Sequence, residues 1–148
     1  MKALSVQLPW AWLFFLKQNP KDCENRSWKL PDKMIGERIA IHCAKTIDYD
    51  GWFHLEGFPA NYGLDTNDEF MNVFYVTPQK IEALRGTLIG EVTIQVCRFR
   101  FGEENDNLYS KWSVPGQYGF YVDSPVLYDK PIPYRGQLGF FEVELTDE

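Results

Sequence analysis

Three charged side chains follow one another at short spacing near the start of the chain: Lys21, Glu24 and Arg26. Glu24 and Arg26 lie in a segment with the alternating pattern of a strand, where side chains repeat every two residues, so they should share one face. We expect Lys21 in the turn before this strand. A carboxylate between two cations stays ionised, because nearby positive charges lower its pKa. The spacing therefore predicts one site with two positive charges and one negative charge.

This charged trio (Lys21, Glu24 and Arg26) is compatible with three kinds of role. The lysine and the arginine can hold a phosphate while the glutamate accepts a hydrogen bond from the amino group of a base. In a small hydrolase, Lys21 and Glu24 would instead be the catalytic pair, with Arg26 as an electrostatic stabiliser. Without any ligand, the trio would be a salt-bridge network that closes the fold.

Aromatic residues make up 16% of the chain, and five of them are tryptophans. A nucleobase needs a flat surface on which to stack, and each stacked base contributes about 1–3 kcal/mol. Trp10 and Trp28 flank the charged trio in the sequence, and Trp112 lies in a predicted loop. We expect these three side chains to provide the stacking surface of a ligand site, whereas most other aromatic side chains should fill the core.

Two further residues are expected to border the same cleft. His42 shares one face of a predicted strand with Arg38, and Lys45 follows that strand and extends its basic rim. The histidines and cysteines have no zinc-site spacing, and the neighbours His42 and Cys43 would point to opposite sides of a strand, so we expect no metal site. The sequence contains no phosphate-binding loop and no dinucleotide-binding motif, so no cofactor is expected.

The elements that position these residues are mostly strands. Alternating or apolar segments predict strands at residues 3–7, 22–28, 37–44, 88–101, 118–122 and 139–145. A proline-rich connection is expected between the last two. Helices are expected from Pro9 through Leu16, around 49–55 and at 77–85. Five to six strands and few helices predict an α+β fold, a small mixed β-barrel with two or three short helices at its edge. At 148 residues, without repeats or linkers, residues 1–148 should form one domain.

Composition limits the kinds of partner. The net charge of −6 argues against a protein that coats nucleic acid without selectivity. This charge is uneven, because residues 1–45 carry +4 and the remainder carries −10. Three cysteines without a paired spacing predict no disulfide framework and favour the cytoplasm. The longest apolar run, at 8–16, is shorter than the roughly 20 residues that span a bilayer, so no membrane partner is expected.

The charged trio is also part of a longer pattern. The strings LSVQLPWAW, NPKDCENRSW and ERIAIHCAK follow one another in an order that resembles the ASCH domain family, which belongs to the PUA-like superfamily of β-barrels. The signature of that family is G-x-K-x-x-E-x-R between the first helix and the second strand, and Lys21, Glu24 and Arg26 match it at the right spacings. Asn19 replaces its glycine, and asparagine is the residue that next best tolerates a left-handed backbone. The resemblance implies a PUA-like barrel with a basic cleft.

The resemblance implies more than one activity. It favours a cleft that accepts single-stranded RNA or a modified nucleoside. An alternative is a hydrolase of a modified nucleoside such as an acylated cytidine, or a nuclease-like hydrolase. The amidohydrolase branch resembles this chain at Lys21 but carries Thr where Glu24 stands, so its threonine nucleophile is missing here. A different hypothesis is a protein-interaction module in which the acidic, aromatic segment 48–76 docks a partner.

Overall fold

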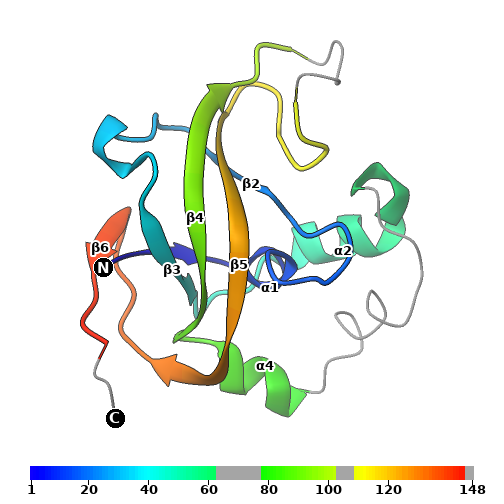
Figure 1. Cartoon of the computed structure of the whole chain (residues 1–148). Coiled ribbons are helices and arrows are strands. Elements are labelled where there is room, and N and C mark those ends of the chain that lie inside the picture. The colour runs from blue at the N-terminus through cyan, green and yellow to red at the C-terminus, as the bar shows by residue number, and fades with distance from the viewer. Residues whose placement is uncertain (63–77, 103–108, 146–148) are drawn as a thin grey trace.

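The computed structural model describes residues 1–62, 78–102 and 109–145 (Figure 1). Its elements in chain order are β1 (Lys2–Val6), α1 (Trp10–Leu13), β2 (Cys23–Arg26), η1 (Asp32–Met34), β3 (Arg38–Cys43), α2 (Tyr49–Gly57), η2 (Pro59–Tyr62), α4 (Pro78–Leu84), β4 (Thr87–Phe99), β5 (Tyr118–Pro133) and β6 (Phe140–Glu142). Among the helices within these described ranges, none has the length and apolar character needed to cross a membrane.

The six strands form one mixed sheet in the order β2-β5-β4-β3-β1-β6. The β1–β3 pair is parallel, and the other neighbouring pairs are antiparallel. The long pairing of β4 with β5 contains register irregularities of the bulge type, which bend strands and increase their twist. The sheet curls into a half-barrel, with the α-helices gathered at one side of it (Figure 1). The predicted α+β class and the small, mixed barrel with few helices at its edge are confirmed.

The strand β5 is longer than predicted, because it continues through the segment that we expected to be a proline-rich connection. It contains Pro125, Pro131 and Pro133. Proline has no N–H to donate and is therefore confined to strand edges that need no hydrogen bond. The strand β2 pairs with β5 only over Tyr118–Tyr121. Beyond that stretch, one edge of β5 has no strand partner among the described residues, so the prolines are tolerated there.

The helix α1 is shorter than predicted and ends at Leu13 instead of Leu16. The carbonyl oxygen of Leu13 accepts a hydrogen bond from the backbone N–H of Lys21 at 2.8 Å, so the chain turns back onto the end of the helix. Phe14 and Leu16 remain buried, at 1% and 6% exposure, although they lie outside the helix. This turn brings Lys21 next to the end of α1.

The main hydrophobic core lies inside the curl of the sheet and contains side chains of β1, β3, β4 and β5 together with residues of α1 and η1. Ile39, Ile41 and Cys43 face this core, as the alternation of their segment predicts. The opposite face of β3 is buried as well. Ala40 belongs to a second, smaller apolar cluster with Phe141 from the C-terminal part of the chain. The strand β3 is therefore covered on both sides.

Candidate functional site

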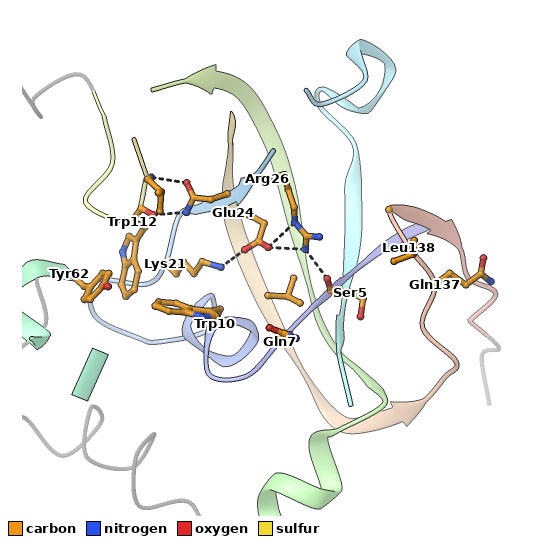
Figure 2. Close-up of a pocket in the computed structure, with 14 residues that line it drawn as sticks. Ser5, Gln7, Trp10, Lys21, Glu24, Arg26, Tyr62, Trp112, Gln137 and Leu138 are labelled. Atoms are coloured by element: carbon orange, nitrogen blue, oxygen red, sulfur yellow. Dashed lines mark hydrogen bonds and ion pairs between the residues drawn. The ribbon is translucent and has the colours of Figure 1, made fainter. Parts of the chain in front are cut away.

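The charged trio forms one hydrogen-bonded cluster beside β2 (Figure 2). Lys21 Nζ donates to Oε1 of Glu24. Arg26 donates to the other oxygen, Oε2, from Nε at 3.1 Å and from Nη2 at 2.8 Å. The side chain of Lys21 is 3% exposed and that of Glu24 is 11% exposed, whereas Arg26 is 23% exposed. The carboxylate is thus held between two cations, and the arginine is the member most open to solvent.

Local backbone geometry brings Lys21 to this position. Asn19 has a φ of +49°, a left-handed conformation that asparagine tolerates better than most residues do. The turn at Asn19 directs the chain back towards α1. The ammonium group of Lys21 lies 4.1 Å from the centre of the Phe14 ring and 6.0 Å from that of Trp10, where a cation–π attraction stabilises it. Lys21 is therefore positioned by the turn and by two aromatic rings.

Strand geometry places the other two members of the trio. In β2, Glu24 and Arg26 are paired with Phe120 and Tyr118 of β5, respectively. They are two residues apart and point to the same face, as predicted. The Nη2 group of Arg26 donates a further hydrogen bond to the backbone carbonyl oxygen of Ser5, at 2.8 Å. Within the described residues the Nη1 group has no hydrogen-bond partner, so its N–H donors are available to a ligand.

Electrostatics keep Glu24 ionised. Burial alone would raise the pKa of Glu24, but the positive charges of Lys21 and Arg26 and their hydrogen bonds outweigh this effect and hold the pKa below its ordinary value. Both carboxylate oxygens already accept hydrogen bonds from cations. Such a carboxylate is a weak proton acceptor. The cluster as a whole carries a net positive charge and can attract an anionic or polar group.

A cavity of about 590 Å³ opens beside the charged trio. This first cavity falls within the size range of small-ligand sites, about 300–1,000 Å³. Aromatic side chains line it on one side, namely Trp10, Tyr62 and Trp112, and the other side is bordered by Gln137 and Leu138 (Figure 2). The first cavity therefore combines flat apolar surfaces with the charged trio, which is the combination that a nucleobase requires.

The aromatic side of the first cavity is held rigidly. Trp112 is 6% exposed and stacks on Tyr62, with ring centres 5.0 Å apart and an angle of 29° between the rings. Trp10 donates from Nε1 to Oδ2 of Asp48 at 2.8 Å. Gly51 of α2 packs so closely on Trp10 that an added Cβ would lie 2.7 Å from its ring. The indole of Trp10 is therefore fixed from two sides.

The loop that carries Trp112 is anchored to β2 by Asn25. The Nδ2 group of Asn25 donates to the carbonyl oxygen of Trp112, and Oδ1 accepts from the N–H of Val114, both at 2.8 Å. Asn25 also lines the first cavity. The same short strand thus supplies Glu24 and Arg26 of the trio and the residue that positions Trp112.

Trp28 does not line the first cavity. It follows the end of β2, where the alternation of a strand no longer determines the direction of side chains, and it packs against the main core. Its ring meets those of Phe120 and Phe140 edge-on, with centres 5.2 Å and 5.8 Å apart. Trp28 is partly buried against the core, and the ring that lies beside Trp10 and Trp112 is that of Tyr62.

His42 and Lys45 also lie outside the first cavity, and both line a second cavity. His42 is 2% exposed. Its Nε2 donates to the carbonyl oxygen of Tyr134 at 2.8 Å, because a carbonyl can only accept, and its Nδ1 accepts from the hydroxyl of Ser5 at 2.9 Å. Burial lowers the pKa of His42, and the charge of Lys45 adds to this, although the bond to Tyr134 opposes it. His42 is thus a neutral residue that joins neighbouring segments.

The segment proposed for protein docking is described only up to Tyr62; the remainder of 48–76 lies outside the described residues. The exposed side of α2 and its end carries three aromatic side chains, Tyr49, Phe53 and Phe58, at 62%, 68% and 57% exposure. Among the described residues, no three side chains of His, Cys, Asp or Glu gather in a way that could hold a metal ion.

Sequence reasoning missed several cavity residues for identifiable reasons. Ser5 contributes its backbone carbonyl oxygen, which every residue type has, so the sequence cannot indicate this role. Tyr62 lies in a segment without a stable period. Asn25 carried the one usable signal, because asparagine is depleted in strands and needs a local reason to be there. Its partners, however, lie more than 80 residues away along the chain.

A scan against protein-family models found no match to this chain, and a search of curated proteins found none either. The function of the site is therefore inferred from its geometry and from the sequence pattern that surrounds the charged trio.

Proposed function

We propose that this chain is a binding module of the ASCH type, whose first cavity takes one base of a single-stranded RNA or a modified nucleoside. The observation that carries this proposal is the meeting of the charged trio with Trp10 and Trp112 around a cavity of about 590 Å³. Aromatic rings offer a stacking surface to any base, and charged donors beside them select polar base edges or phosphate oxygens. The resemblance to the ASCH family supports the same function.

Each member of the trio has a distinct role in this proposal. Arg26 is the principal ligand contact, because its side chain is the most exposed of the three and its Nη1 donors have no described partner. Lys21 also lines the first cavity and adds positive charge from a nearly buried side chain. Glu24 orients both cations through its two oxygens, and so acts on the ligand through them.

The geometry favours binding over hydrolysis. A general base works best when its pKa lies near the working pH, about 7 in most cells. Glu24 is the sole carboxylate among the described residues that line the first cavity, and none of those residues is a histidine. Because the pKa of Glu24 is lowered and both its oxygens are occupied by cations, it is poorly suited to take a proton from water.

Calorimetric titration with the four ribonucleosides and with short oligoribonucleotides tests this proposal. We expect saturable binding to the wild type and at least a tenfold weaker affinity in Arg26→Gln. Arg38→Gln is the matched control, because Arg38 also forms an ion pair with a carboxylate, that of Glu91 at 2.9 Å, but lies outside the first cavity. Equal affinity in the wild type and Arg26→Gln, or no saturable binding to the wild type, would contradict the proposal.

A further inference from the structure

The second cavity, of about 830 Å³, adjoins the first. Ser5 lines both cavities. One continuous segment runs between them, because residues 134–136 border the second cavity and residues 137–139 border the first. The two cavities are therefore neighbours along this segment, close enough for adjacent parts of one chain-like ligand.

The charge of the second cavity differs from that of the first. Lys45 and Arg135 line it, both side chains are exposed, and none of the described lining residues is acidic. Within the part of the chain that the structure describes, neither cation forms an ion pair. In the first cavity Glu24 offsets part of the positive charge. In the second cavity no described carboxylate does so, and the positive charge is open to an anion.

Packing holds Lys45 in place at the second cavity. Its methylene groups lie across Gly86, where an added Cβ would come 3.2 Å from Cε and 3.4 Å from Cγ of the lysine. Gly86 has a φ of +74° and is fixed by two backbone hydrogen bonds. Its N–H donates to the carbonyl oxygen of Cys43 at 2.7 Å, and its carbonyl oxygen accepts from the N–H of Tyr134 at 3.1 Å. The aliphatic part of the Lys45 side chain therefore packs against Gly86, and its ammonium group extends from this contact.

The segment that carries Arg135 is also fixed. Gly136 presses against His42 so closely that an added Cβ would lie 2.6 Å from Cε1 of the imidazole. The hydrogen bonds of His42 to Tyr134 and Ser5 tie the same segment to β1 and β3. Buried His42 thus acts as a positioning residue for the backbone beside Arg135.

From these observations we infer that the second cavity is a phosphate subsite, in which Lys45 and Arg135 bind a phosphodiester of the strand whose base enters the first cavity. Lysine and arginine side chains both bind phosphate in proteins, the ammonium group as a point charge and the guanidinium group as a fork of donors. This inference rests on the proposed function and deepens it: the ligand is an oligoribonucleotide, and a free nucleoside fills only half of the site.

The test compares each ribonucleoside with its matching homopolymeric tetraribonucleotide by calorimetric titration. The wild type should bind the tetranucleotide at least tenfold more tightly than the nucleoside. In the double variant Lys45→Gln/Arg135→Gln this advantage should fall to less than threefold, while nucleoside affinity is unchanged. The dependence of log K on log[salt] should also become shallower, by about 0.7 for each phosphate contact that is lost. Inorganic phosphate should compete more strongly with the tetranucleotide than with the nucleoside.

The control is Lys29→Gln/Lys33→Gln, which removes two exposed lysines that line neither cavity. It should keep the full advantage of the tetranucleotide. If the Lys45→Gln/Arg135→Gln variant also keeps this advantage, the phosphate subsite is overturned. Saturable nucleoside binding to the wild type would in that case still support the proposed function. If the wild type binds neither the nucleosides nor the tetranucleotides, the proposed function and the phosphate subsite are both overturned. Thermal melting of each variant verifies that it is folded.

Discussion

Arg26 donates a hydrogen bond from Nη2 to the backbone carbonyl oxygen of Ser5 at 2.8 Å. Arg26 lies on β2, at one end of the strand order, and Ser5 lies on β1, next to the strand at the other end. The contact therefore crosses the open side of the half-barrel. Because Glu24 holds the same guanidinium group, the charged trio both closes the curl of the sheet and forms one wall of the first cavity.

Removing the carboxylate of Glu24 should destabilise the fold strongly. In Glu24→Gln the buried ammonium group of Lys21 loses its counter-charge, and an uncompensated buried charge costs about 3–5 kcal/mol. Urea denaturation of the variant and the wild type measures this difference. Glu91→Gln is the control, because the Arg38–Glu91 pair is more exposed and its loss should cost about 1 kcal/mol or less. Equal losses in the two variants would show that the trio is not specially coupled to the fold.

Stability should fall on mild acidification because of His42. Its pKa is lower in the folded protein than the ordinary value of about 6.5 that it regains on unfolding, so the unfolded chain binds more protons in this range. The contribution of a neutral His42 is complete above about pH 6.5 and is lost as the pH falls through the folded pKa. We predict that His42→Gln removes this part of the decline in the free energy of unfolding.

Urea denaturation at a series of pH values, from about 5 to about 7.5, measures the predicted decline. If His42→Gln shows the same slope as the wild type, His42 is not the group that titrates.

Asn25 should affect ligand affinity through the position of Trp112. Asn25→Ala removes both hydrogen bonds to the loop that carries Trp112, and each such bond contributes about 0.5–1.5 kcal/mol to stability. We predict a lowered melting temperature and a several-fold weaker affinity for nucleosides, because the stacking surface of Trp112 is less well fixed. Gln95→Ala, which removes an exposed hydrogen bond to Asp123, is the control and should change neither quantity. Unchanged affinity in Asn25→Ala would show that these two hydrogen bonds are not needed to position the binding surface.

Features that depend on local sequence were predictable. The spacing of Glu24 and Arg26 determines their common face, and the asparagine at position 19 indicates the left-handed turn that brings Lys21 to them. Ile39 and Ile41 are two residues apart on β3, so the side of the strand that faces the main core could be predicted. These features need only the geometry of a strand or a turn, which a few neighbouring residues specify.

Features that depend on what packs against an element were not predictable. The strand β5 continues through its prolines because one of its edges has no described partner, and strand order is a property of the whole sheet. Alternation placed His42 on the correct face of β3, but it contained no information that Tyr134 and Phe141 cover that face. Trp28 packs against the core. Its direction could not be predicted from strand alternation, because β2 ends two residues before it.

The most direct test of the binding site follows the indole N–H signals of the tryptophans by NMR while a tetraribonucleotide is added. We predict saturable shifts of the Trp10 and Trp112 signals, because both indoles line the first cavity, and no shift of the Trp28 signal, because its ring packs against the core. Trp10→Phe, Trp112→Phe and Trp28→Phe assign the three signals. Shifts confined to Trp28, or none at Trp10 and Trp112 at saturation, would contradict the first cavity as the site where a base binds.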